Sequence, residues 1–151
     1  MNPLARTAFA LILCALAAGA WAQHRPADAD AVALVKRAVQ AIRKEGAVKA
    51  YTRISDQSGP FANRDLYVVV TSMDGTLLAS GANARIVGKN LLDLKDIDGK
   101  PFVRERVELA RTQPSFWQHY QYMRPATGRI EPKHVYCERL NESVVCSGIY
   151  D

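Results

Sequence analysis

Two cysteines near the end of the chain, Cys137 and Cys146, have the spacing of a disulfide. They stand in two β-rich runs on either side of Asn141 and Glu142, which is typical of a hairpin with a two-residue loop. In that register the cysteines face each other as a non-hydrogen-bonded pair, where Cα atoms approach to about 4.5 Å and a disulfide can form. We predict that this bond staples the hairpin, because the chain has no Cys-x-x-Cys sequence of the kind found in redox sites.

The other residue types that commonly perform catalysis follow no known pattern here. His119 and His134 lie on separate predicted strands, and His24 stands near the start of the chain, with no zinc-ligand spacing around any of them. The chain also lacks nucleophile-elbow, phosphate-loop and dinucleotide-binding motifs. The acidic loop around Asp96 has Leu94 where a calcium loop begins with an acid. We therefore predict no enzymatic activity, no metal and no cofactor.

The first 22 residues are typical of a secretory signal peptide. Arg6 precedes an apolar stretch over residues 8–18, and the small-residue pattern Ala20-Trp21-Ala22 follows. The apolar run is shorter than the ~20 residues of a membrane-spanning helix. We predict that residues 1–22 are removed on export and that residues 23–151 form a single domain in an oxidising compartment, where a disulfide is stable.

The composition of the chain excludes several classes of protein. Its 151 residues are 48% hydrophobic and 23% charged, which argues against disorder and against a multipass membrane protein. The formal net charge is +5, but lysines and arginines are scattered among acidic residues. We therefore expect no nucleic acid as a partner, and once the signal is removed we expect no segment that inserts into a membrane.

The hydrophobic pattern predicts helices and strands in an α+β arrangement. The predicted helices cover residues 28–44, 47–53 and 101–112, and the strands cover 65–72, 76–80, 115–124, 130–139 and 143–150. Such an order favours a five-stranded antiparallel sheet with a long helix behind it. The loop over residues 81–100 is then a candidate wall for a pocket on the other face.

Several short motifs follow one another in a fixed order along the predicted domain. They are Arg64-Asp-Leu-Tyr67, Val87-Gly-Lys-Asn-Leu-Leu-Asp-Leu-Lys-Asp96 with Asp98-Gly-Lys100, Phe102-Val-Arg-Glu105, Trp117 with Tyr120, Glu131-Pro-Lys133 with Tyr136, and Gly148-Ile-Tyr150. In this order they resemble the single Cache domain, type 2, a PAS-like family. The resemblance implies a long N-terminal helix behind the sheet, and a small-molecule site enclosed by a loop and helix inserted after the second strand. It also implies an extracytoplasmic sensor, and type 2 domains often recognise short carboxylates.

A carboxylate site of this kind needs a cation, and Lys133 in the Glu-Pro-Lys motif is our first candidate. The hairpin register places it opposite Tyr150 and beside Gly148, although an isolated lysine is usually solvated. The expected hydroxyl donors are Tyr67, Tyr120 and Tyr122, whose alternative role is core packing.

Two weaker candidates for the same site are Trp117 and Arg104. Trp117 shares the opposite face of its strand with His119 and reaches the site only if the strand carries a bulge. Arg104 stands near the start of the inserted helix, from which it could reach an anion, and its alternative role is a surface charge.

The function that we expect is that of a stand-alone periplasmic domain that binds a short carboxylate such as acetate, propionate, pyruvate or lactate. No membrane helix or signalling module follows Asp151 in the sequence, so we expect a separate membrane sensor or transporter as partner. The alternative is a periplasmic interaction module that forms a homodimer through its N-terminal helix and whose pocket is filled by bulky side chains.

Overall fold

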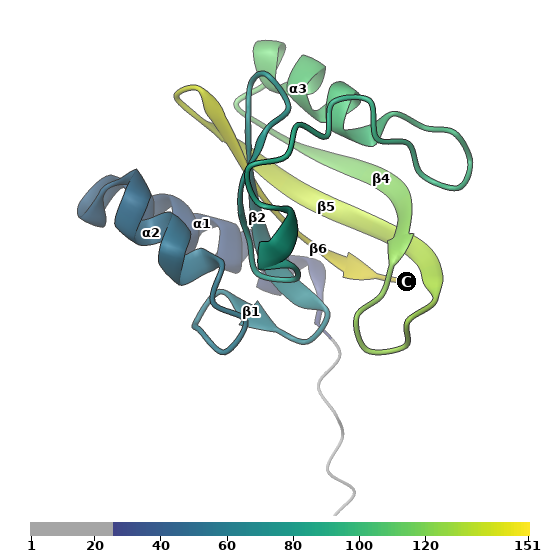
Figure 1. Cartoon of the computed structure of the whole chain (residues 1–151), viewed down its shortest axis with the longest axis horizontal. Coiled ribbons are helices and arrows are strands. Elements are labelled where there is room, and N and C mark those ends of the chain that lie inside the picture. Colours follow the sequence, from purple (N-terminus) through teal and green to yellow (C-terminus); the bar gives the residue numbers. More distant parts are fainter. Residues whose placement is uncertain (1–25) are drawn as a thin grey trace, which may run out of the picture.

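A computed structural model describes residues 26–151, so the predicted signal peptide lies outside the described residues. The helices are α1 (Asp28–Glu45), α2 (Ala47–Ile54), the 3-10 helix η1 (Ala84–Ile86) and α3 (Phe102–Thr112). The strands are β1 (Ala62–Asn63), β2 (Leu66–Ser72), β3 (Leu77–Ser80), β4 (Ser115–Met123), β5 (Ile130–Leu140) and β6 (Ser143–Tyr150). Figure 1 shows these elements along the chain.

The strands form one antiparallel sheet in the order β1-β2-β6-β5-β4, with β3 paired to β2. All five predicted strands are present, and the two-residue β1 is an addition that the pattern did not predict because it is too short to show a period. The predicted α+β fold is confirmed. In the part of the chain that the structure describes, no helix combines the length and hydrophobicity that crossing a bilayer requires.

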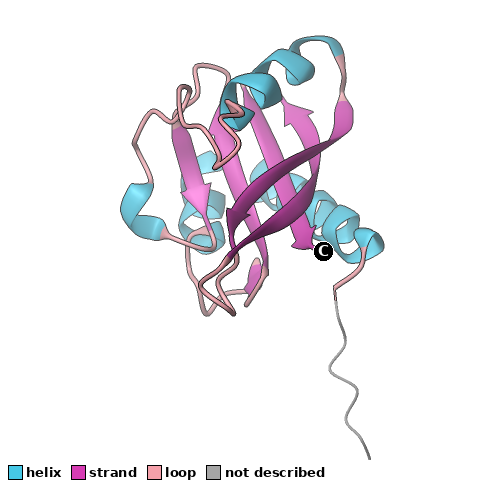
Figure 2. Ribbon diagram, turned by 90° about the vertical axis from the view of Figure 1, so that its right-hand side faces the viewer, coloured by secondary structure: helices cyan, strands magenta, loops and turns pink. Residues whose placement is uncertain are grey.

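Helices cover both faces of the sheet (Figures 1 and 2). On one face, α1 and α2 bury Val35, Ala38 and Ile54 in a core with Val68 and Val145. On the other face, α3 and the disulfide form a second core with β4. The strand period of two separates these cores, since alternate side chains of one strand point to opposite faces.

The long helix α1 has clear signals at both ends. Asp28 and Asp30 lie in its first turn, and the carboxylate of Asp30 accepts a hydrogen bond of 2.8 Å from the backbone N–H of Ala27. Arg43 and Lys44 complement the helix dipole in the last turn. Gly46, with a φ of 83°, ends α1 and allows α2 to begin at the next residue.

The C-terminal hairpin has the predicted register. Leu140 pairs with Ser143, Cys137 pairs with Cys146, and Lys133 pairs with Tyr150. The two cysteines form the predicted disulfide, with a Cα–Cα distance of 4.2 Å, and both are fully buried on the α3 side of the sheet. The bond therefore joins β5 to β6 directly below the inserted helix.

We expect the disulfide to contribute about 2–3 kcal/mol to the free energy of unfolding, because it closes a short loop in the unfolded chain. Urea unfolding with and without dithiothreitol measures this contribution, and the double variant Cys137→Ala/Cys146→Ala is the control. The reductant should destabilise the parent protein and leave the double variant unchanged. Equal stability of the parent under both conditions would contradict this role.

Candidate functional site

A cavity of about 480 Å³ lies between the sheet, α3 and the loop that follows β3. Its walls are formed by residues of β2, β3, β4 and α3, by residues between positions 82 and 97, and by Pro125 and Ile130 at the turn between β4 and β5. The predicted pocket wall over residues 81–100 thus supplies part of the lining. Bulky side chains do not fill this space.

Arg106 is the buried cation that faces this cavity. Arg106 is only 3% exposed, and it lines the cavity from its position on α3. Nε donates to Oε1 of Gln118 at 3.2 Å, and Nη2 donates to the hydroxyl of Tyr120 at 3.2 Å. The guanidinium also lies 5.9 Å from the ring centre of Phe102 and 5.7 Å from that of Tyr120. No carboxylate lies within 4.0 Å of it among residues 26–151.

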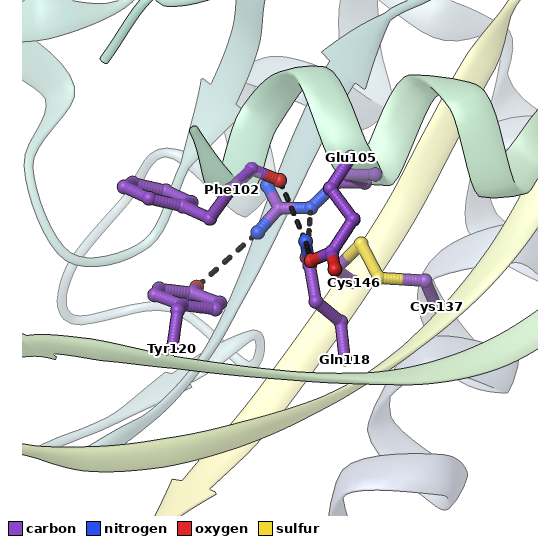
Figure 3. The surroundings of a disulfide bond; sticks show 7 residues. Phe102, Glu105, Gln118, Tyr120, Cys137 and Cys146 are labelled. Atoms are coloured by element: carbon purple, nitrogen blue, oxygen red, sulfur yellow. Dashed lines mark hydrogen bonds between the residues drawn. A yellow bond between two sulfur atoms is a disulfide. The ribbon is translucent and has the colours of Figure 1, made fainter. Parts of the chain in front are cut away.

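Contacts between α3 and β4 set the position of Arg106, and Figure 3 shows Phe102, Glu105, Gln118 and Tyr120 among them. The side-chain amide of Gln118 donates to the backbone carbonyl of Phe102 at 2.6 Å and to Oε2 of Glu105 at 2.6 Å. The rings of Phe102 and Tyr120 are stacked with their centres 4.3 Å apart. Gln118 and Tyr120 project from β4 toward α3, and the disulfide lies beside them. These contacts hold the first turn of α3 against the strand.

Lys133 is also buried, at 4% exposure, but it does not line the cavity. Nζ donates to the hydroxyl of Tyr67 at 2.7 Å and lies 3.9 Å from the centre of the Tyr67 ring and 4.7 Å from that of Tyr150. The hydroxyls of Tyr67 and Tyr150 are 3.2 Å apart, and that of Tyr150 donates to the carbonyl of Met123 at 2.8 Å. The amine is therefore connected to the cavity by its hydrogen bond to Tyr67, which lines the wall.

Burial shifts the pKa values of this group of side chains. It lowers the pKa of the Lys133 amine well below its usual 10.5, and the positive charge of Arg106 lowers it further, while Asp65 acts in the opposite direction. Burial likewise raises the pKa of the Tyr67 hydroxyl well above 10.0. The surroundings thus favour the uncharged forms of both groups.

The structure brings some of the predicted site residues together and separates others. Tyr67, Tyr120 and Tyr122 all line the cavity, and Lys133 lies behind Tyr67. Trp117 and Arg104 do not line it. A ligand contact by any of these residues stays a prediction.

Trp117 points to the opposite face of β4, where its ring packs against His134 and Tyr136 and the residue is 38% exposed. The paired register of β4 with β5 runs without a bulge, so alternation keeps Trp117 away from Tyr120. Arg104 is exposed and pairs with Asp93 at the surface. It is two residues from Arg106, which places it on the other side of α3.

Our sequence prediction did not include Arg106. A signal was present, because Arg106 stands four residues after Phe102 and four before Ala110, both of which belong to the apolar face of the helix. Charged residues are rarely buried without a partner, so the arginine at this position argued against a place on the buried face of the helix.

Comparison with known proteins agrees with this architecture. The sequence matches the family model "Single Cache domain 2" over residues 21–151. The chain belongs to this family. Cache domains are extracytoplasmic sensor domains that bind ligands and are not enzymes. No curated protein sequence matches this Cache domain at a significant level.

Solved structures show the same fold at low sequence identity. A methyl-accepting chemotaxis protein from Vibrio parahaemolyticus is 21% identical, with a TM-score of 0.70 over 81% of this chain and 86% of that chain. The periplasmic sensor domain of a chemotaxis protein is 20% identical, with a TM-score of 0.63 over 79% and 86%. A Cache chemosensory domain described for its carboxylic acid recognition is 18% identical, with a TM-score of 0.68 over 81% and 91%.

We expect Lys133→Met to remove a dependence of stability on pH. Between the lowered pKa of the folded amine and 10.5, the unfolded chain binds a proton that the folded chain does not. The free energy of unfolding of the parent protein should therefore rise with pH, by at most about 1.4 kcal/mol per pH unit. Urea unfolding from about pH 7 to about pH 8.5, below the range where tyrosines ionise, measures this slope.

The exposed Lys36 of α1 offers a matched control, because Lys36→Met removes a solvated amine. This variant should keep the slope of the parent protein, whereas Lys133→Met should lose it. A slope that is the same in all three proteins would show that the amine of Lys133 keeps its ordinary pKa.

Proposed function

We propose that this Cache domain binds a small organic anion, with a carboxylate as the group it recognises. The observation that carries the proposal is Arg106, a buried guanidinium that lines the cavity without a carboxylate partner in the described chain. A buried cation costs several kcal/mol in lost hydration, and a bound anion offsets that cost. The Cache structure known for carboxylic acid recognition supports the same chemical class.

The donors around Arg106 suit a carboxylate. Two of the five guanidinium N–H groups are used by Gln118 and Tyr120, so others remain for a ligand. The hydroxyl of Tyr120 accepts from Arg106, which leaves its own hydrogen to donate to a ligand oxygen. Lys133 lies behind Tyr67, and Tyr67 and Tyr122 complete the aromatic wall that we expect at the ligand.

The compartment and the partner follow from the proposed sensory role. We expect the predicted signal peptide at residues 1–22 to deliver the domain to the periplasm, where small acids from the environment arrive. A sensory domain needs an output, and a separate membrane sensor or transporter that reads the occupied domain is the partner that we expect.

Arg106→Gln should weaken carboxylate binding by tenfold or more, because a hydrogen bond to a charged group contributes about 1.5–3 kcal/mol. Isothermal titration with a panel of monocarboxylates and their uncharged amides measures the effect. The parent protein should bind at least one acid and none of the corresponding amides.

Arg104→Gln is the matched control for this experiment, since it removes an exposed guanidinium from the same helix. It should keep the affinity of the parent protein. The proposal fails if no acid in the panel binds the parent, or if Arg106→Gln and Arg104→Gln bind equally well. Circular dichroism of both variants distinguishes a lost contact from a lost fold.

The predicted export also has a direct test. Protein isolated from the periplasmic fraction of cells that express the full chain should begin at Gln23, because the small-residue pattern ends at Ala22. Mass spectrometry of the intact protein measures its N-terminus. A periplasmic protein that keeps residues 1–22 would contradict the prediction of a cleaved signal peptide. That result would not bear on the proposed binding of an anion at Arg106.

A further inference from the structure

Exposed apolar side chains gather at the opening of the cavity. Seven large hydrophobic residues are exposed in the described part of the chain, and four of them line this one cavity. These four are Leu94, Ile97, Met123 and Ile130, with exposures of 38%, 70%, 58% and 52%. We call them the apolar mouth. Exposed apolar residues that gather in one place often mark a binding site, whereas scattered ones are normal on a protein surface.

The apolar mouth is held together by pairing and by one carboxylate. Met123 and Ile130 are register partners at the end of β4 and the start of β5. Asp96, which stands between Leu94 and Ile97, accepts a hydrogen bond of 3.0 Å from the backbone N–H of Gln121. The same carboxylate accepts from the backbone N–H groups of Asp98 and Lys100 at 3.0 and 2.9 Å. The loop is therefore fixed beside the strand that carries Met123.

The cavity is much larger than the short acids that the resemblance suggested. A volume of about 480 Å³ falls within the ~300–1,000 Å³ of pockets that enclose drug-sized ligands. Acetate and propionate have only four and five non-hydrogen atoms, so either acid would leave most of this space to water. Apolar walls hold such water poorly, because it lacks hydrogen-bond partners there.

The lining places one buried cation, Arg106, in a largely apolar wall, and the charged residues Lys95 and Asp96 line the cavity beside Leu94 and Ile97 of the apolar mouth. Arg106 and Tyr120 supply charge and hydrogen bonds at one place. Much of the remaining wall is apolar, including Val69, Leu77, Ile86, Leu91 and Val103. A ligand that matches this pattern carries an anionic head at one end and a long apolar part at the other.

We propose that the ligand is a carboxylic acid with an apolar body of several methylenes or an aryl group, which extends from Arg106 to the apolar mouth. The inference rests on the proposed function, because it assumes that the anion lies at Arg106. It adds the class of acid that the cavity selects. Each methylene buried along the apolar wall should then increase affinity about fourfold.

A series of straight-chain acids from acetate to octanoate, studied by isothermal titration below the micellar concentration, tests this inference. Affinity should rise along the series, and the heat capacity change of binding should become more negative. Flat or falling affinity in a protein that binds acetate would overturn the inference and leave the proposed function standing. No binding by any acid would overturn both. Octanol should bind at least tenfold more weakly than octanoate if the head lies at Arg106.

Variants of the apolar mouth separate a specific contact from general adsorption. Ile97→Ser and Met123→Ser should each weaken octanoate binding at least threefold and leave propionate binding unchanged. Val48→Ser is the control, because Val48 is 85% exposed on α2 and does not line the cavity. The inference is overturned if Val48→Ser weakens octanoate binding as much as the mouth variants do, or if the mouth variants bind octanoate as the parent does.

Discussion

A guanidinium buried without a counter-charge is the constraint on which the site depends. Removing Arg106 from water costs several kcal/mol, and neutral groups offset only part of this cost. Gln118 and Tyr120 accept two of its hydrogen bonds, and two aromatic ring faces lie within 6 Å of it. None of these groups carries negative charge. The positive charge of Arg106 is therefore not neutralised by its neighbours, and in this buried position it attracts an anion more strongly than it would in water.

The cation also has a fixed position before any ligand arrives. It projects from a helix, and Gln118 ties the first turn of that helix to β4 through the carbonyl of Phe102. Below α3, a disulfide joins β5 to β6. A site built on such elements loses little side-chain and backbone freedom on binding, so more of the interaction energy contributes to affinity. The loop that carries Leu94 and Ile97 depends instead on one carboxylate, that of Asp96.

The sequence was informative where a strand period or a turn decides the structure. Alternation placed Tyr120 and Tyr122 on one face and Trp117 on the other, and the turn length determined the pairing of Cys137 with Cys146. The same reasoning did not find Arg106. Arg104 stands two positions before it in the sequence, which is about 200° around the helix axis. Only the apolar spacing of α3 indicates which arginine faces inward, and a charged residue on an apolar face is an exception to that spacing.

Lys133 shows a second limit of prediction from sequence. The register of two strands determines which residues are opposite each other, but it does not determine which side chain covers another. The pairing with Tyr150 followed from the turn, whereas the cover by Tyr67 depends on how two rings pack. Its amine nevertheless belongs to the site's electrostatics, since the charge of Arg106 lowers its pKa. An anion beside Arg106 opposes that repulsion and favours the protonated amine. If an anion binds there as we propose, its binding would be linked to the protonation of Lys133, whose hydrogen bonds lead through Tyr67 and Tyr150 to the backbone of β4 at Met123.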